Sequence, residues 1–420
     1  MRIGFSKHNI TPQVPIYLAG YAERREPAQG INDPLYAKSI ILEDDNGEKI
    51  ALIFLDILYV TKAQVDIIRN RVEKLTGIKG SHIIISSSHT HSGPLTYNNP
   101  LFGKYDSTYV DWLLKVIPGI VLQASKDTIE CKLGWYQSEV YDIGGNRRDK
   151  KIKSDTYVTV ISFADLKNEP IAVLFNYNCH PTILSHKNLM ISADFPGSAV
   201  KTLERIYGKD VFFAFSNGAC GDISTRFTRR SQAISEKDRI GRILAAEVAK
   251  GIEKTRYEEQ SYISLIEKSF KLRKREIPTE KQLDKEMERC KNKLRSIEKI
   301  NPQNREIRVL KTTLQGYEIL KSLKKYKDDL EDEGIITAIR LGEGCIVAHP
   351  AELFSKLGNQ IMKESSFPIN MIMGYSNGII GYIPDEASYI QGGYESLSCR
   401  FECGTGEELV NMAAMLIREL

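Results

Sequence analysis

A short apolar run that ends in two histidines restricts the fold of this chain more than any other feature. Residues 82–94 have the sequence His-Ile-Ile-Ile-Ser-Ser-Ser-His-Thr-His-Ser-Gly-Pro, which places His89 and His91 just after the run. The β-branched residues predict a buried strand, and the Gly-Pro pair predicts the end of regular structure. In open α/β sheets, ligands usually bind at the carboxyl ends of strands. Side chains two residues apart in an extended segment share a face, roughly 6–7 Å apart, so both histidines could serve one site. The alternative is a polar loop with solvated histidines.

The order of the predicted elements indicates an α/β fold. A helix is predicted at 62–75, where apolar residues recur at helical spacing up to Gly77, and a second at 105–125. Strands are predicted at 2–9, 38–43, 50–55, 133–140, 157–163, 170–176, 211–215, 261–272, 335–341, 345–349 and 370–375. Further helices are predicted at 235–254, 350–360 and 407–420, and one begins at Asp194 as its N-cap. We therefore expect a mixed β-sheet core flanked by helices, with a long irregular segment between Tyr375 and Gly404.

Residues 278–332 differ in composition from the rest of the chain. They are rich in lysine and glutamate, with apolar residues at helical spacing, and predict a helical hairpin broken at Asn301-Pro302. Acids alternate with bases, which indicates a solvated surface rather than a nucleic-acid patch. The hairpin could cover a site as a lid or pair two subunits of a homo-oligomer. We expect residues 1–420 to form a single catalytic domain that contains this insertion.

Charge and cysteine content exclude several classes of protein. The formal net charge of +4 on 420 residues gives no reason to expect nucleic-acid binding. The chain shows neither a signal segment nor an apolar run of membrane-spanning length. The seven cysteines are scattered without zinc-knuckle spacing, which favours reduced thiols and a cytoplasmic protein.

Possible metal ligands recur where predicted strands and helices begin or end. Besides His89 and His91, His180 follows a strand and Glu352 lies at a predicted helix start. Two histidines and a carboxylate with one open position form the usual catalytic zinc arrangement, which suits hydrolysis because zinc activates water. Each residue also has a simpler interpretation: His180 could be a structural histidine, and Glu352 a favourable charge on a helix dipole.

The sequence resembles the neutral ceramidase family. Residues 88–94, Ser-His-Thr-His-Ser-Gly-Pro, are similar to the family's Thr-His-Thr-His-Ser-Gly-Pro motif. Six further blocks resemble family motifs in the same order: Gly20-Tyr21-Ala22, Asn146-Arg147, residues 176–181, Gly221-Asp222-Ile223-Ser224, Pro350-Ala351-Glu352 and Tyr394-Glu395. The resemblance extends from Met1 to about Cys403, nearly the whole chain.

The resemblance implies a site residue by residue. It implies that one zinc ion is bound by His89, His180, Glu352 and Tyr394. His91 matches the histidine that contacts the reacting group, Arg147 the arginine that holds substrate, and Tyr382 a tyrosine near the oxyanion. Ser224 matches the serine taken as nucleophile in some accounts of the family, although Thr225-Arg226 follows it where the family has Pro-Asn. We favour a zinc-activated water over Ser224, because no histidine follows Ser224 locally to activate it.

The substrate expected from the resemblance is a small-molecule or lipid-like N-acyl compound whose amide bond is hydrolysed. Family members that act on ceramide are generally secreted or membrane-associated and carry a C-terminal β-sandwich domain. This sequence shows neither feature, and we therefore expect the amidohydrolase chemistry on a substrate that need not be ceramide. Two alternatives stay open: a zinc esterase or deacetylase acting on a small polar metabolite, and a binding protein of the same fold without turnover.

Overall fold

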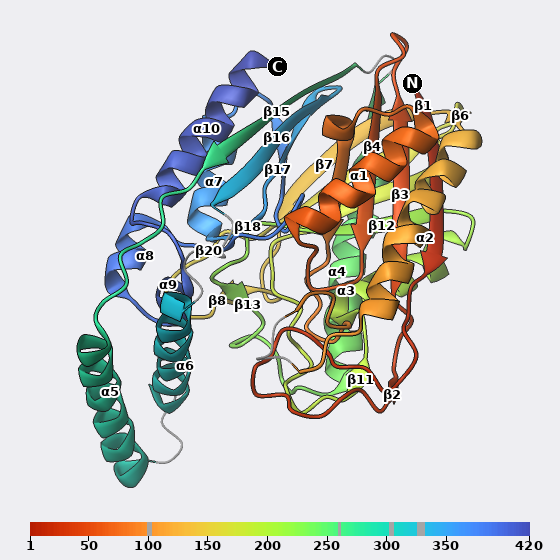
Figure 1. Ribbon diagram of the computed structural model, residues 1–420. Coiled ribbons are helices and arrows are strands. Elements are labelled where there is room, and N and C mark those ends of the chain that lie inside the picture. The colour runs from red at the N-terminus through yellow and green to blue at the C-terminus, as the bar shows by residue number, and fades with distance from the viewer. Residues whose placement is uncertain (99–102, 259–261, 302–305, 326–331) are drawn as a thin grey trace.

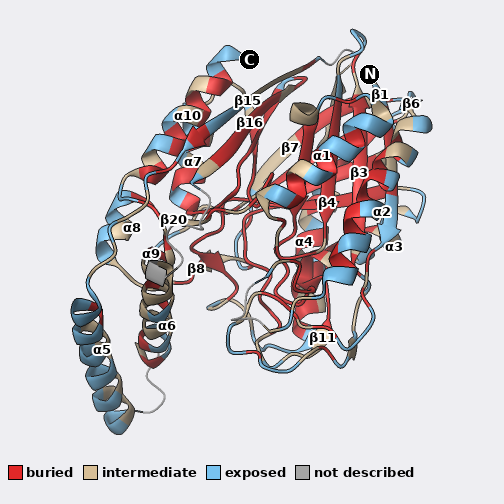
Figure 2. Ribbon diagram, viewed as in Figure 1, coloured by how far each residue is buried: buried red, intermediate tan, exposed pale blue. Residues whose placement is uncertain are grey.

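Three β-sheets surround a common apolar core, and helices cover their outer faces (Figure 1). The computed structural model describes residues 1–98, 103–258, 262–301, 306–325 and 332–420. Both parallel and antiparallel strand pairs occur, so the predicted mixed sheet core flanked by helices is confirmed. Figure 2 shows the strands buried, whereas the helices expose one face to solvent.

The first sheet carries the histidine pair at its edge strand, β5. Its order is β5-β4-β3-β1-β6, with bounds Ile83–Ser87, Lys49–Leu55, Tyr36–Glu43, Arg2–Asn9 and Ile129–Glu130. Strand β5 is parallel to β4, and the other pairs are antiparallel. Helices α1 (Lys62–Thr76) and α2 (Ser107–Lys126) cover the outer face. Helix α1 ends at Gly77, as predicted, because that residue adopts a left-handed conformation (φ 76°).

The second sheet brings His180 towards the same region. Its order is β12-β10-β9-β7-β14, with bounds Phe212–Asn217, Pro170–Tyr177, Tyr157–Ala164, Lys132–Glu139 and Arg256–Glu258. Helices α3 (Asp194–Tyr207) and α4 (Ile234–Lys254) pack on its outer face. Strands β10 and β12 are parallel, so residues that follow them meet at one edge of the sheet.

The third sheet has the order β15-β16-β17-β19, with bounds Ile263–Lys271, Glu333–Leu341, Gly344–Ala348 and Ile369–Met373. Helices α7 (Ser355–Glu364) and α10 (Thr405–Glu419) cover it. Small strand pairs join the loops at the site: β2 (Gly30–Ile31) with β11 (Met190–Ile191), β8 (Gly145–Asn146) with β13 (Ile223–Ser224), and β18 (Ala351–Leu353) with β20 (Gly381–Ile383).

The predicted helical hairpin is confirmed. Helices α5 (Glu280–Ile300) and α6 (Glu306–Lys325) pack on each other and project from the main body, at the lower left of Figure 1. Helix α6 also packs against α9 (Tyr394–Ser398). Pro302, where the break was predicted, lies outside the described residues. Within the part of the chain that the structure describes, no helix is both long enough and apolar enough to cross a membrane.

Three local predictions were wrong. The segment from Pro350 does not begin a helix: β18 pairs in parallel with β20, and α7 starts only at Ser355. The stretch after Tyr375 is not irregular, because it contains β20, α8 (Glu386–Gln391) and α9. Asp194 is not the N-cap of α3. Instead it has a positive φ of 52°, and its carboxylate accepts the N–H groups of Leu184 and Phe195.

Candidate functional site

His89 leaves β5 in a left-handed conformation, with φ 64°, so the histidine pair does not continue the strand as we had expected. Its Nδ1 lies 3.1 Å from the carbonyl oxygen of Leu58, to which it donates. The imidazole stacks on the ring of Tyr375, with centroids 4.0 Å apart and planes 20° apart. These contacts fix the buried ring so that Nε2 carries its lone pair towards the centre of the site.

His180 is held in the same manner from the second sheet. It follows β10, forms a parallel bridge with Ser224, and is fully buried. Its Nδ1 lies 2.7 Å from the carbonyl oxygen of Cys220 and donates to it, so Nε2 is again an acceptor. Burial lowers the pKa of His180 to about 4, which leaves the ring neutral at pH 7.

Glu352 completes a compact group with these two histidines. One of its carboxylate oxygens, Oε2, lies 3.2 Å from Nε2 of His180 and 3.5 Å from Nε2 of His89. Burial alone would raise the pKa of this carboxyl, but the two histidines beside it hold the pKa well below its usual value. Glu352 is therefore ionised at pH 7. Strand β18, rather than a helix start, places it there.

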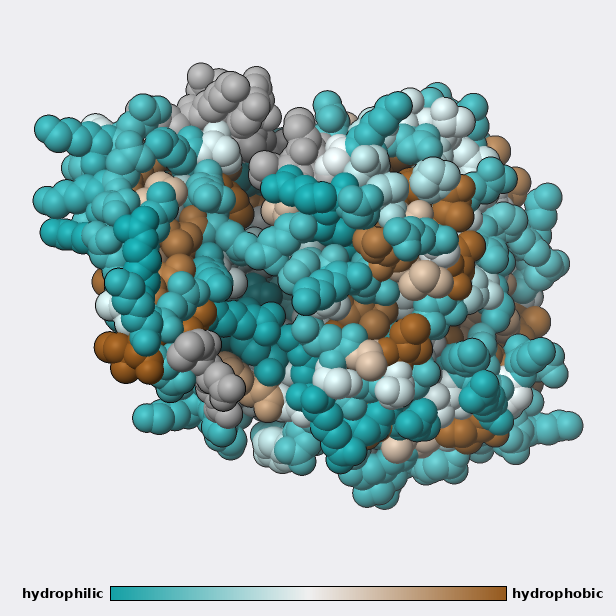
Figure 3. Space-filling view, turned by 90° about the horizontal axis from the view of Figure 1, so that it is seen from below, coloured by the Kyte–Doolittle hydropathy of each residue, from teal (hydrophilic) through white to brown (hydrophobic). Residues whose placement is uncertain are grey.

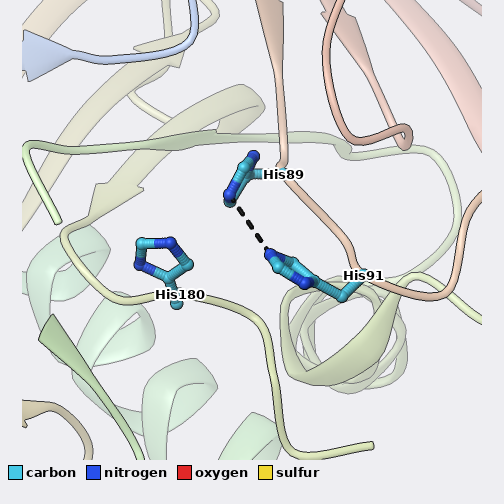
Figure 4. Close-up of side chains that lie close together, drawn as sticks. All are labelled: His89, His91 and His180. Atoms are coloured by element: carbon cyan, nitrogen blue, oxygen red, sulfur yellow. Dashed lines mark hydrogen bonds between the residues drawn. The ribbon is translucent and has the colours of Figure 1, made fainter. Parts of the chain in front are cut away.

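His91 forms a triangle with His89 and His180, as Figure 4 shows, with ring centroids 4.9–5.8 Å apart. The two Nε2 atoms are 3.3 Å apart, and the rings are nearly perpendicular. The ring of Tyr21 lies 4.9 Å from that of His91, and a Cβ on Gly20 would come within 2.5 Å of His91 Nδ1. That nitrogen is buried and has no hydrogen-bond partner among the described residues. Burial, with His89 and His180 nearby, lowers the pKa of His91 well below its usual value.

The donor set fits a divalent cation. Nε2 of His89, Nε2 of His180 and Oε2 of Glu352 bear lone pairs that face one another at 3.2–3.5 Å, which is repulsive unless a positive charge lies between them. Nitrogen and carboxylate ligands in this number are those of a catalytic zinc site. Ligating atoms of His89, His91 and His180 also lie within 4.8 Å of one another. Geometry alone therefore admits His91 as a further ligand.

Arg147 and two tyrosines, Tyr382 and Tyr394, lie beside Glu352 and the histidines. Arg147 donates from Nη2 to the hydroxyl oxygen of Tyr382 at 3.0 Å and from Nε to Glu395 at 2.7 Å. The Tyr382 ring is nearly parallel to that of His180, with centroids 6.4 Å apart. The Tyr394 ring lies 5.8 Å from that of Tyr382, and burial, together with Glu352, raises the pKa of Tyr394 to about 12.

Ser224 is close to His180 through the backbone. Its hydroxyl oxygen accepts the N–H of Arg226 at 3.2 Å, and it hydrogen-bonds to no described histidine or carboxylate. Strand β13, which ends at Ser224, pairs with β8 just before Arg147. The structure thus brings all eight predicted residues into one region around the ends of β5, β10, β18 and β20.

Sequence reasoning missed three supporting residues. Glu395 is buried and pairs with Arg147, although its place beside Tyr394 in a family-like block was a signal. Asp222 accepts the backbone N–H of Ser355 at 2.7 Å and the side-chain amide of Asn146 at 2.9 Å. Tyr375 supports the His89 ring. No local pattern distinguishes Tyr375 from an ordinary core residue, because it meets His89 only in the folded chain.

The comparisons with known proteins show the family and the fold of this chain. Residues 1–238 match the family described as neutral/alkaline non-lysosomal ceramidase, N-terminal. The chain belongs to the neutral ceramidase family. The neutral ceramidase of Drosophila melanogaster is 23% identical over 258 residues, which cover 53% of this chain and 36% of that protein. Neutral ceramidase 1 of Arabidopsis thaliana is 26% identical over 231 residues, covering 49% and 29%. The matched region spans about a third of these relatives.

Solved structures show that the fold is shared over a greater length. A structure described as ceramidase complexed with C2 has a TM-score of 0.80 at 16% identity and covers 100% of this chain and 75% of its own. The neutral ceramidase from Pseudomonas aeruginosa has a TM-score of 0.79 at 17% identity, with the same coverage. The neutral ceramidase fold therefore includes the segments after residue 238 that carry Glu352, Tyr382 and Tyr394.

Proposed function

We propose that this protein is a zinc-dependent hydrolase that cleaves the amide bond of an N-acyl compound with water as the nucleophile. The observation that carries the proposal is the buried convergence of His89, His180 and Glu352 in a chain of the neutral ceramidase family. These three residues, with the phenol of Tyr394, would hold the ion. When bound there, zinc would lower the pKa of a water molecule and polarise the amide carbonyl.

His91 is proposed to transfer the proton to the leaving amine. Its ring contacts His89, and its pKa is lowered by burial, so the imidazole is neutral at pH 7 and able to accept a proton before passing it on. Gly20 and Tyr21 pack against the ring and restrict its orientation. A group that must present a proton to one atom benefits from such restriction.

Tyr382 is proposed to donate to the developing oxyanion. Because its oxygen accepts from Arg147 Nη2, its own proton is available for another acceptor. Glu395 fixes the guanidinium through Nε, so Arg147 positions Tyr382 and adds positive charge to the site. A preorganised donor of this kind typically contributes about 10²–10³ to kcat.

Water is favoured over Ser224 as the nucleophile. The Ser224 hydroxyl accepts a backbone N–H, and no described base is hydrogen-bonded to it. A serine without an adjacent base stays protonated and weakly nucleophilic at neutral pH. Under this proposal Ser224 supports the backbone of His180, with which it forms a bridge.

Residues 1–420 are proposed to act as one catalytic domain, with α5 and α6 inserted into it. The named relatives are ceramidases, and the matched region covers about a third of them. Ceramide is therefore one candidate substrate among N-acyl compounds. A second candidate function is hydrolysis of an ester or acetyl group on a small polar metabolite, because the same site would polarise any acyl carbonyl.

The test is hydrolysis of a panel of N-acyl amides, including C8 ceramide, beside matched esters. Purified protein is assayed as isolated, after removal of metal with a chelator, and after addition of zinc. We expect cleavage of amides that is lost with the chelator and restored by zinc. An active metal-free protein would contradict the mechanism, and cleavage confined to esters would favour the second candidate.

A further inference from the structure

The inserted hairpin borders the site through helix α6. A Cβ on Gly316 would lie 3.2 Å from Cα of Tyr394 and 3.0 Å from Cβ of Leu397, so α6 packs directly on α9. One residue earlier, Gln315 donates to Glu23 at 2.6 Å, close in sequence to the Gly20-Tyr21 turn that contacts His91. Helix α6 therefore bridges the two segments that flank the site, those carrying Tyr394 and Tyr21.

Arg226 and Arg229 lie in the loop after Ser224, and Arg308 lies on α6. Arg226 donates to the backbone oxygen of Arg147 at 2.8 Å, and Arg229 donates to that of Thr182 at 2.6 Å, two residues after His180. Arg308, exposed on α6, lies near enough to both to influence their pKa values. None of the three forms an ion pair with a carboxylate among the residues that the structure describes.

The local balance of charge is positive. Burial, then Arg147 and Arg308, lowers the pKa of Arg226 to about 10, and burial also lowers that of Arg229. Burial and neighbouring cations both disfavour the charged guanidinium, and an anionic ligand would offset both effects.

The acidic groups in the same region are already engaged. Glu395 pairs with Arg147 at 2.7 Å. Asp194 accepts two backbone N–H groups. Glu23 contacts Gln315 and lies 3.2 Å from His186. Arg226 and Arg229 donate to neutral oxygens, so an anionic ligand could still pair with the charge of these guanidinium groups.

The surface beside the hairpin is hydrophilic. Figure 3 shows the molecule from below, where a hollow lined by hydrophilic residues lies between the side of the hairpin and the main body. A neutral lipid offers these guanidinium groups no anionic partner, whereas an anionic substrate does.

We propose that the substrate is an N-acyl compound with an anionic group, a carboxylate or a phosphate, bound by Arg226, Arg229 and Arg308. The proposal rests on the amide hydrolysis proposed above and names its substrate class. Guanidinium groups bind carboxylates and phosphates by paired, charge-assisted hydrogen bonds. It also gives the hairpin a role, because α6 supplies Arg308 and would contribute to substrate choice.

The test compares amides that differ only in charge. N-octanoyl phosphoethanolamine is paired with N-octanoylethanolamine, and N-octanoylaspartate with its diamide, so that phosphate and carboxylate are distinguished. We expect kcat/KM to be roughly tenfold or more higher for one or both anions than for the matched neutral compound. The preference should shrink as ionic strength rises. Equal rates for charged and neutral compounds in both pairs would overturn the proposal.

Variants assign the preference to the arginines. Arg308→Glu reverses an exposed charge without opening the core, and should abolish most of the preference; Arg229→Ala should reduce it as well. The matched control is Arg289→Glu, on α5 of the same hairpin, whose exposed side chain pairs with Glu286. Loss of the preference in the control as much as in Arg308→Glu would overturn the assignment.

Binding separates this proposal from the proposed function. Sulfonamide analogues of all four compounds cannot be cleaved as amides. Each is titrated into the intact protein, and binding is measured by calorimetry. Selective binding of an anion without cleavage of any amide would leave anion recognition standing and remove the proposed reaction. Cleavage of neutral amides without selective binding of an anion would remove the anion proposal alone. Absence of binding by every analogue would overturn it too.

Discussion

Nε2 of His180 lies 3.2 Å from Oε2 of Glu352, although the two residues are 172 positions apart in the chain. The His180 ring donates from Nδ1 to a backbone carbonyl, and its pKa is about 4, so the facing nitrogen is an acceptor at pH 7. The Glu352 carboxyl is ionised. Two acceptors at this distance in a buried site call for a cation, and the first prediction follows from this pair.

The purified protein is expected to contain about one zinc ion per chain. Glu352→Gln and His180→Ala each remove a proposed ligand and should weaken zinc binding by more than the 10–100-fold typical of outer-sphere changes. Zinc content is measured by elemental analysis after dialysis against a weak chelator. His8→Ala, which removes an exposed histidine elsewhere, is the control. Full zinc occupancy in both ligand variants would refute the assignment.

The ion pair between Arg147 and Glu395 gives the second prediction. Glu395→Ala would leave a buried guanidinium without its carboxylate, and we expect it to cost about 3–5 kcal/mol in the free energy of unfolding. Glu395→Gln keeps a hydrogen-bond acceptor and should cost less, while lowering kcat because Arg147 no longer holds Tyr382 as firmly.

The control is Glu402→Gln, an exposed partner of Arg273 whose loss should change stability by less than about 1 kcal/mol. Denaturant titration and steady-state kinetics measure the two effects. Combining Glu395→Gln with Tyr382→Phe should lower kcat by less than the sum of the separate effects, since both act through one hydroxyl. Independent, additive effects on kcat would exclude the positioning role.

Much of the fold could be predicted from local pattern. The helix that stops at Gly77, for example, follows from spacing and C-cap chemistry that no distant contact overrides. The segment at Glu352 could not be predicted in this way. Its residues are as compatible with a helix start as with an extended strand. Only pairing with β20, some thirty residues later in the chain, selects the strand.

The site was predicted in the same uneven way. The family-like motifs indicated His89, His180 and Tyr394, and the folded chain brings them into one region. The sequence did not indicate the direction of the His89 side chain. His89 adopts a positive φ, so the alternation of side chains along a strand does not apply to it. Tyr375 and Glu395 act through contacts formed only on folding, so their part in the site could not be derived from spacing.

The third prediction concerns a buried histidine outside the proposed ligand set. Burial lowers the pKa of His349 to about 3, and its Nδ1 accepts the N–H of Ala351. The ring is neutral when folded but becomes protonated below about pH 6.5 when unfolded. Its contribution to stability is therefore complete above pH 6.5 and is lost as the pH falls towards 3, at about 1.4 kcal/mol per pH unit.

His349→Asn keeps a neutral acceptor that does not titrate. Stability of the variant should therefore decline less than that of the wild type between pH 6 and pH 4, by roughly 2–3 kcal/mol. Denaturant titrations at fixed pH, with both proteins at the same zinc content, give the comparison. Parallel pH profiles would show that His349 does not titrate on unfolding.

The last prediction separates the two roles that geometry admits for His91. If His91 transfers a proton, His91→Ala should keep one zinc per chain and lower kcat by about 10²–10⁴; if it is a third nitrogen ligand, zinc is lost as in His180→Ala.

Gly20→Ala tests the same point without removing the ring, because the new Cβ would lie 2.5 Å from His91 Nδ1 and displace it. We expect lower kcat with zinc retained. The control is Gly47→Ala, which also has a positive φ (81°) but no atom within 4 Å of the added Cβ, so it reproduces the backbone strain and not the contact. Zinc loss in His91→Ala equal to that in His180→Ala would assign His91 to the metal and leave the proton transfer to another group.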